Sequence, residues 1–98
     1  MPTPTNEVSN RAIITVLGTD RSGIVAAVAG VVAENNVNIL DISQTILQGI
    51  FTMTMLVDLE GSKVEFAVLQ SQLDALAETL GVQITMQREE VFRYMYRL

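Results

Sequence analysis

Alternating and clustered hydrophobic residues divide the chain into short segments, each of which predicts one element. Residues 11–17 are rich in β-branched side chains and end before Gly18, which predicts a buried strand. The next apolar side chains recur at helical spacing, at Ile24, Val28, Val31 and Val32. They predict a helix of about three turns that ends at Asn35–Asn36, because asparagine tolerates the left-handed conformation that stops a helix. We expect Asp20 or Ser22 to cap its start.

Two segments of alternating polarity follow and predict a β-hairpin. Apolar and polar side chains alternate in residues 37–47 and again in residues 50–59. Gln48–Gly49 lies between them and predicts a tight turn, because glycine adopts positive φ without steric cost. The core-facing side chains of the second segment are predicted to include Phe51, Met53 and Met55. Their period of two favours core packing over a cofactor site.

The second half of the chain predicts a longer helix, a strand and a short tail helix. Ser62 and Glu65 fit a capping box that starts the longer helix, and Gly81 ends it. The apolar stripe of this helix consists of Phe66, Leu69, Leu73, Leu76 and Leu80. Strict alternation in residues 82–86 predicts a half-buried strand. Residues 89–98 predict a short helix, because its acidic start and basic end match the helix dipole.

The expected order of elements is therefore β-α-β-β-α-β. An α+β, ferredoxin-like sandwich satisfies this order, with one antiparallel sheet, two helices on one face of it, and a short C-terminal helix in addition. Residues 1–10 show no periodicity and lack the basic, apolar character of a secretory leader. We therefore expect a disordered lead-in and a cytoplasmic protein.

Composition narrows the range of functions. The chain has 98 residues, which suits one domain, and it contains neither cysteine nor histidine. These absences exclude a disulfide framework, a thiolate nucleophile and the commonest metal ligands, so we expect no catalysis, no metal and no cofactor. The net charge is −5 and the 6 basic residues are scattered, which argues against nucleic-acid binding. No apolar run approaches the length of a membrane span.

Two glycines bracket the loop that leads into the first predicted helix. Gly18 would let the chain turn, and Gly23 would let a ligand approach free backbone N–H groups at the helix start. Such a helix start carries partial positive charge and suits a carboxylate or a phosphate. A structural interpretation stays open, with Gly18 as a turn residue and Gly23 as a packing residue. A nucleotide-binding P-loop is excluded, because Ile24 and Val25 stand where that motif needs lysine and then serine or threonine.

Small and polar residues mark two further faces. The first helix carries small residues on its second face, at Ala26, Gly30 and Ala33. This face packs either against a partner subunit in a symmetric dimer or against the chain's own second helix. In the strand that follows, Asp41 and Gln44 stand among apolar neighbours. They either line a site or lie on an exposed sheet edge.

Three stretches resemble the ACT domain, the amino-acid-sensing module named from aspartate kinase, chorismate mutase and prephenate dehydrogenase. These stretches are residues 18–25, 35–43 and 51–55. The resemblance runs from about residue 11 to residue 88. It includes the small stand-alone ACT proteins of bacteria and the paired ACT domains of the glycine cleavage repressor. The chain departs from the pattern at Ser22, where many ACT domains have proline, and at Tyr96, where stand-alone members often have histidine.

The resemblance implies that residues 11–88 form an ACT domain, followed by a helical tail over residues 89–98. It also implies a homodimer, often arranged side by side, in which the first loop of one subunit meets the start of the second strand of its neighbour. On the loop, the ligand-binding residues that it implies are Thr19, Asp20, Ser22, Gly23 and Ile24, and Arg21 lies among them. On the strand they are Asn38, Ile39 and Leu40.

The leading hypothesis is a non-enzymatic regulatory domain that binds a small ligand, an amino acid, at a dimer interface. The alternative is an interaction module without a ligand, which regulates a larger partner protein. An enzyme hypothesis takes one form: acylphosphatases share the ferredoxin-like fold, and Arg21 and Asn38 could hold a phosphate as they do. The loop does not resemble the acylphosphatase pattern, so this third hypothesis ranks last.

Overall fold

The computed structural model describes residues 10–19 and 23–95. The elements of these ranges are β1 (Arg11–Thr19), α1 (Ile24–Glu34), β2 (Asn38–Leu47), β3 (Ile50–Asp58), α2 (Phe66–Leu80), β4 (Gln83–Arg88) and α3 (Glu89–Met95). Residues 1–9 of the predicted lead-in lie outside the described residues. Asp20, Ser22 and Tyr96 also lie outside them, so the predictions for these residues are not tested. Across the described part of the chain, every helix is too short or too polar to traverse a bilayer.

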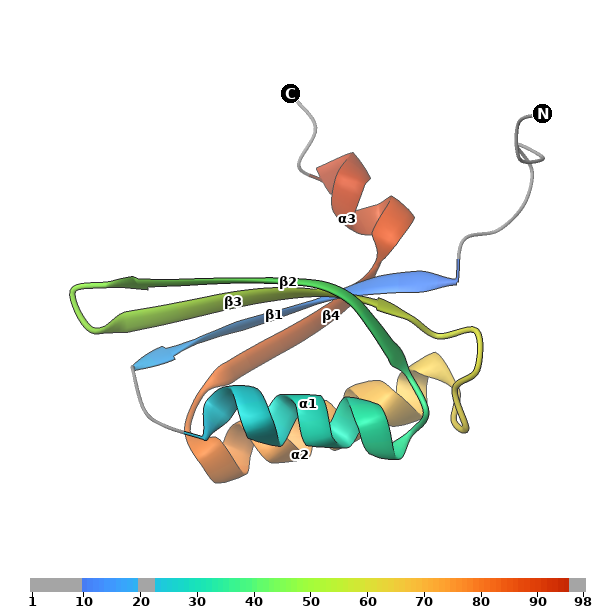
Figure 1. The fold of residues 1–98 in the computed structure, drawn as a ribbon, viewed down its shortest axis with the longest axis horizontal. Helices are drawn as coiled ribbons and strands as arrows, with labels where there is room; N and C mark the ends of the chain where they lie inside the picture. The colour runs from blue at the N-terminus through green and yellow to red at the C-terminus, as the bar shows by residue number, and fades with distance from the viewer. Residues whose placement is uncertain (1–9, 20–22, 96–98) are drawn as a thin grey trace.

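The strands form one antiparallel sheet in the order β2-β3-β1-β4. Helices α1 and α2 lie side by side on one face of this sheet, and α3 rises from the other face (Figure 1). This arrangement confirms the predicted ferredoxin-like sandwich with its additional C-terminal helix. It leaves β2 and β4 as the two edge strands.

The β2–β3 hairpin turns where the sequence predicts. Gln48 and Gly49 have φ of 50° and 84°, so both central residues of the turn are left-handed. A two-residue turn of this hand matches the twist of the flanking strands. At the other end of the hairpin, Ile39 pairs with Val57 while Asp41 pairs with Leu56, which leaves Leu40 as the extra residue of a β-bulge.

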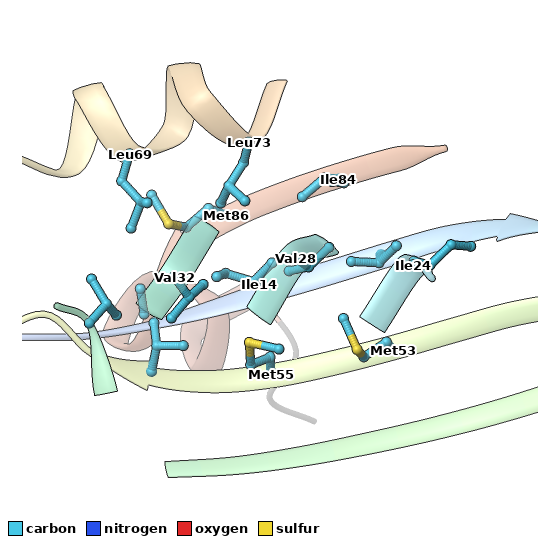
Figure 2. Close-up of a cluster of buried hydrophobic side chains, with 14 of the residues drawn as sticks. Ile14, Ile24, Val28, Val32, Met53, Met55, Leu69, Leu73, Ile84 and Met86 are labelled. Atoms are coloured by element: carbon cyan, nitrogen blue, oxygen red, sulfur yellow. The ribbon is translucent and has the colours of Figure 1, made fainter. Parts of the chain in front are cut away.

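One hydrophobic core lies between the sheet and the two helices that cover it (Figure 2). The strands contribute Ile14, Val16, Met53, Met55, Ile84 and Met86, and the helices contribute Ile24, Val28, Val32, Leu69 and Leu73. Burial of each large apolar side chain stabilises the fold by about 1.5–3 kcal/mol relative to exposure. Phe51, Met53 and Met55 are core residues, as their period of two predicts.

Both predicted ends of the long helices are confirmed. Asn36 has φ of 61° and ends α1, and Gly81 has φ of 72° and ends α2. The neighbouring Asn35 is buried, and its Nδ2 donates to the carbonyl of Val31 at 2.8 Å and to Oε1 of Gln72 at 2.6 Å. The end of α1 is therefore tied to α2 by a side-chain hydrogen bond.

The predicted capping box at the start of α2 is wrong. The helix begins three residues later than a Ser62 cap requires, at Phe66, and its N-cap is Glu65. Ser62 instead forms a local turn, in which Oγ donates to the carbonyl of Val64 and accepts from its N–H. The segment before α2 is also bonded to the end of α1, because Lys63 N–H donates to the carbonyl of Asn35. These bonds hold residues 62–64 in a bend, so the helix does not begin until Phe66.

Helix α3 is anchored by a buried carboxylate. Glu89 accepts two hydrogen bonds from Arg11, at 2.9 and 2.6 Å, and two from Arg93, at 3.0 and 2.8 Å. The hydrogen bond to Glu89 and then its negative charge raise the pKa of Arg11 above its ordinary value. The apolar residues Val91 and Met95, which share a face of the predicted tail helix, are 44% and 52% exposed. The Arg11–Glu89 ion pair, and not those two side chains, joins the start of α3 to β1, whereas the Arg93–Glu89 pair lies within α3.

Candidate ligand site

The structural roles of the two glycines differ from the structural interpretation that the sequence left open, in which Gly18 is a turn residue and Gly23 a packing residue. Gly18 lies inside β1, opposite Phe51, and is not a turn residue. A Cβ atom at Gly18 would lie 2.6 Å from Cγ1 of Val82, so the absence of a side chain there permits close packing.

Gly23 is needed for its backbone conformation. Its φ is 92°, a left-handed value, and an added Cβ would meet no heavy atom within 4 Å. Packing within the described residues therefore does not explain this glycine, and none of those residues fills the place of a side chain at the start of α1. The structure thus assigns the packing role to Gly18 and the conformational role to Gly23.

The start of α1 is an uncovered positive helix end within the described residues. Gly23 occupies the N-cap position, no side chain of the described residues caps the helix, and no acidic residue stands in its first turn. The first helical hydrogen bond runs from Ala27 N–H to the Gly23 carbonyl at 2.9 Å, so the N–H groups before Ala27 have no intrahelical acceptor. The side chain of Ile24 is 1% exposed and belongs to the core, which leaves only its backbone for a ligand.

An apolar cavity of about 470 Å³ adjoins Thr19 at the end of β1. Its lining consists of Leu17, Gly18, Thr19, Ile50, Gly81, Val82 and Gln83. Sequence reasoning found Thr19 but missed the residues from the other strands. The sheet register brings these residues beside Thr19, because Leu17 pairs with Gln83 and Thr19 pairs with Ile50. A single sequence does not show that register.

The predicted strand residues lie at the opposite end of the sheet. Asn38 is exposed and lines a second cavity of about 470 Å³ together with the acidic residues Asp58 and Glu60. Ile39 is half-buried, and Leu40, at the bulge, is 41% exposed. This end of the sheet thus presents a polar, acidic surface.

A single chain does not bring the loop and the strand residues together. Asn38 shares a row of the sheet with Asp58 and Arg11, whereas Thr19 ends the same strand that Arg11 begins. Eight residues along β1 at about 3.3 Å each place these two rows about 26 Å apart. Arg21, the remaining loop residue, lies with Asp20 and Ser22 outside the described residues.

An exposed edge strand connects these two ends of the sheet. Strand β2 is ten residues long, lies at the edge of the sheet and has exposed side chains at every position except Ile39. Asp41 and Gln44 are therefore exposed edge residues, and the Asp41 carboxylate accepts a hydrogen bond from Ile42 N–H. Exposed apolar side chains also line β2, at Leu40, Ile42, Ile46 and Leu47. A long apolar edge of this kind favours pairing with another strand.

The small-residue face of α1 is exposed as well. Ala26, Gly30 and Ala33 are all accessible, and a Cβ at Gly30 would meet nothing within 4 Å. Packing of this face against α2 is therefore wrong, and the face stays available to a second chain. Close approach of another backbone is possible here because these side chains are small.

Comparison with known proteins gives one family and close relatives. The model of a family described as ACT domain matches residues 10–87. The UPF0237 protein of Methanocaldococcus jannaschii is 52% identical over 89 residues, which are 91% of this chain and 99% of that protein. An ACT domain protein from Streptococcus pneumoniae has 45% identity and a TM-score of 0.76, over 91% of this chain and all (100%) of that one. A protein described as a glycine cleavage system transcriptional repressor has 28% identity and a TM-score of 0.71, over 80% of this chain and 44% of that one.

Proposed function

The chain belongs to the ACT domain family, and from this membership we propose that it is a regulatory domain without catalytic activity, which binds an amino acid between two copies of the chain. In this proposal residues 11–88 are the regulatory unit and the segment from Glu89 onward is an attached tail. The ligand lies where the loop of one copy meets the start of β2 in the other.

The open start of α1 is the observation that carries the proposal. Gly23 has left-handed φ and open space beside it, and the helix it starts has no acidic residue in its first turn. A carboxylate is the group that suits such a positive helix end. We therefore place the carboxylate of the amino acid against the backbone at Gly23 and Ile24.

Antiparallel pairing of two β2 strands would complete the site. Leu47, at the end of β2, lies in the same row of the sheet as Ile50 and Thr19. In an antiparallel pair, that end of β2 in one copy lies beside Asn38 at the start of β2 in the other. The pairing would also cover the exposed apolar side chains of β2 and bring the small faces of the α1 helices toward each other.

The two half-sites differ in charge, which suits a zwitterion. The loop half offers a positive helix end, and the strand half offers the amide oxygen of Asn38 with Asp58 and Glu60 beside it. An amino acid placed between them would present its carboxylate to the first and its ammonium group to the second. Its side chain would lie toward the apolar cavity at Leu17 and Val82.

Regulation follows if the ligand binds one arrangement of the dimer more tightly than another. A ligand shifts an equilibrium only by its differential affinity for the two states. Because the ligand bridges two chains, it stabilises the dimer in which both half-sites touch it. A larger protein bound to the domain would respond to this change in the arrangement of the dimer.

Isothermal titration calorimetry with each of the twenty amino acids tests the proposal, with thermal unfolding in parallel. We expect heat and a raised melting temperature with one or a few amino acids. Asn38→Ala should weaken binding at least tenfold, and Asp74→Ala, at an exposed polar residue of α2 that lies in neither half of the site, should leave it unchanged. A dimer that gives no heat with any amino acid at millimolar concentration would favour the interaction module over the amino-acid sensor.

A further inference from the structure

A further cavity, of about 500 Å³, lies at the start of α2 and shares no lining residue with the two cavities of the proposed function. Its lining includes Asn10, Leu59, Val64, Phe66, Ala67 and Arg88. Figure 1 shows the start of α2 at the end of the molecule away from the β2–β3 turn. The 15 residues of α2 separate this cavity from the one at Gly81 by about 22 Å. A volume of this size suits a small molecule.

Arg88 supplies a positive charge to this cavity. Its Cζ atom lies 4.7 Å from the centroid of the Phe66 ring. Cation–π attraction uses the face of the ring and leaves N–H donors of the guanidinium for other groups. Within the described residues, no hydrogen bond or ion pair engages the Arg88 side chain. Its donors are therefore available to an anion that enters the cavity.

The other cations of the described residues are placed differently. Arg11 and Arg93 both bind the carboxylate of Glu89, and Lys63 is exposed to water. Arg88 is half-buried and has no such partner. A partly desolvated charge gains from an anion, because burial of a charge is less costly when the charge is paired. Arg88 thus favours an anion as the occupant.

An apolar wall lies beside Arg88 in the same cavity. Leu59 is buried and belongs to the hydrophobic core, and the half-buried Val64 and Phe66 pack against that core. Core packing therefore fixes the position of the wall. Transfer of an alkyl group from water to such a wall is favourable. A cation next to an apolar wall favours an organic anion over a small inorganic one.

We propose that this cavity binds a small monocarboxylate with an alkyl body, at a site separate from that of the amino acid. The carboxylate lies against the Arg88 guanidinium, whose planar donors fit it in a bidentate pair. The alkyl body lies against Leu59 and Val64. Glu65 also lines the cavity, but it is exposed and forms no ion pair with Arg88. Its negative charge at the rim repels a second carboxylate, so the site discriminates against dicarboxylates.

Nitrogen-15 NMR of the full chain, titrated with sodium hexanoate at constant ionic strength, tests this proposal. We expect saturable shifts at the amides of Phe66 and Ala67 and at Nε–H of Arg88, with a roughly millimolar dissociation constant. The amide of Gly23, at the amino-acid site, should not shift, so the two proposals stand or fall separately. Acetate lacks the alkyl body and hexanamide lacks the charge, so each should bind at least tenfold more weakly.

Substitutions in the cavity give a second test of the site. Arg88→Gln should weaken hexanoate binding at least tenfold. Lys63→Gln is the matched control, because it removes an exposed positive charge from the neighbouring segment without altering the cavity lining, and it should leave binding unchanged. Ala67→Glu places a carboxylate in the cavity and should abolish binding. An acidic residue in the first turn of a helix does not oppose folding, so this variant keeps the test valid if Arg88→Gln fails to fold.

Three results would each overturn the proposal. The first is an absence of saturable shifts at the start of α2 with hexanoate at tens of millimolar. The second is equal affinity for hexanoate and hexanamide, which would mean that the charge of Arg88 takes no part. The third is equal hexanoate affinity in the wild-type chain and in folded Arg88→Gln or Ala67→Glu. Thermal unfolding of each variant establishes that it is folded.

Discussion

The two ends of the sheet are built by different means. At the end near Arg11, side chains tie the elements together: Glu89 holds Arg11 and Arg93, and Asn36 Nδ2 donates to the Gly61 carbonyl at 2.9 Å. We call this the anchored end. At the opposite end the chain turns at Gly23, Gly49 and Gly81, all with positive φ and none with a heavy atom near the position of a Cβ. We call this the glycine end.

This difference separates stability from recognition. Side-chain hydrogen bonds fix the anchored end, so substitutions there should affect the free energy of unfolding. Turns made by glycine leave the backbone accessible and the surrounding space open, which a ligand needs and a core does not. The proposed ligand contacts the glycine end of one copy and the exposed strand start at the anchored end of the other.

The largest expected effect comes from removing the carboxylate of the anchored end. Glu89→Ala should lower the free energy of unfolding by about 2–3 kcal/mol, because it removes a buried acceptor of four charge-assisted hydrogen bonds. The loss stays in that range because Arg11 and Arg93 remain 40% and 68% exposed and can be solvated. Urea unfolding measures it as a shift in midpoint.

Glu90→Ala is the control for that experiment, since Glu90 is exposed and adjacent in sequence. It should change stability by less than about 0.5 kcal/mol. Equal losses for the two variants would mean that the ion pairs of Glu89 do not anchor α3.

The next effect tests whether Gly18 differs from the turn glycines. Gly18→Ala should cost about 1–2 kcal/mol, because its methyl group would overlap Val82 in a packed sheet. In the Val82→Ala background the same substitution should cost much less, since the obstructing methyl groups are gone. A double-mutant cycle measured by thermal or urea unfolding gives the coupling. An absence of coupling between the two substitutions would mean that contact with Val82 does not explain the glycine at position 18.

The third effect separates two glycines that have the same backbone conformation. Gly23→Ala and Gly49→Ala should each lower stability by roughly 1 kcal/mol, because an alanine at positive φ is strained. Only Gly23→Ala should also weaken binding of the amino acid, at least tenfold, because its methyl group enters the space beside the helix start. Calorimetric titration of both variants measures this difference. Equal affinity in the two variants would remove Gly23 from the ligand site.

Local signals in the sequence predicted the elements well. Gln48–Gly49, Asn36 and Gly81 each stop or turn the chain through their own backbone preferences, and the structure confirms all three. The capping box failed because a tertiary contact overrode the local motif: Lys63 N–H bonds to Asn35, far away in sequence. Local periodicity carries no information about such a partner.

The candidate site was only partly predictable for the same reason. The Gly18 packing partner Val82 and the Glu89 partner Arg11 are separated from those residues by most of the chain. Hydrophobic pattern identifies which side of a strand is buried, but it does not give the register that brings distant residues together. The candidate ligand residues on the first loop and at the start of β2 came from family resemblance. That the loop of one copy contacts β2 of the other remains a prediction.

The smallest expected effect has the opposite sign. Gly30 also has open space beside it, but its φ is not positive, so an alanine there suffers no strain. Gly30→Ala should therefore stabilise the monomer by about 0.5–1 kcal/mol, because alanine favours the middle of a helix over glycine.

If the α1 helices face each other in the dimer, the same methyl group should hinder their approach. The gain in melting temperature from Gly30→Ala should then be largest in dilute protein and shrink as concentration rises, because dimerisation stabilises the folded state by mass action. Thermal unfolding over a hundredfold range of concentration measures this dependence. A gain that is the same at every concentration would mean that the interface lies away from the small face of α1, and that β2 alone joins the two copies.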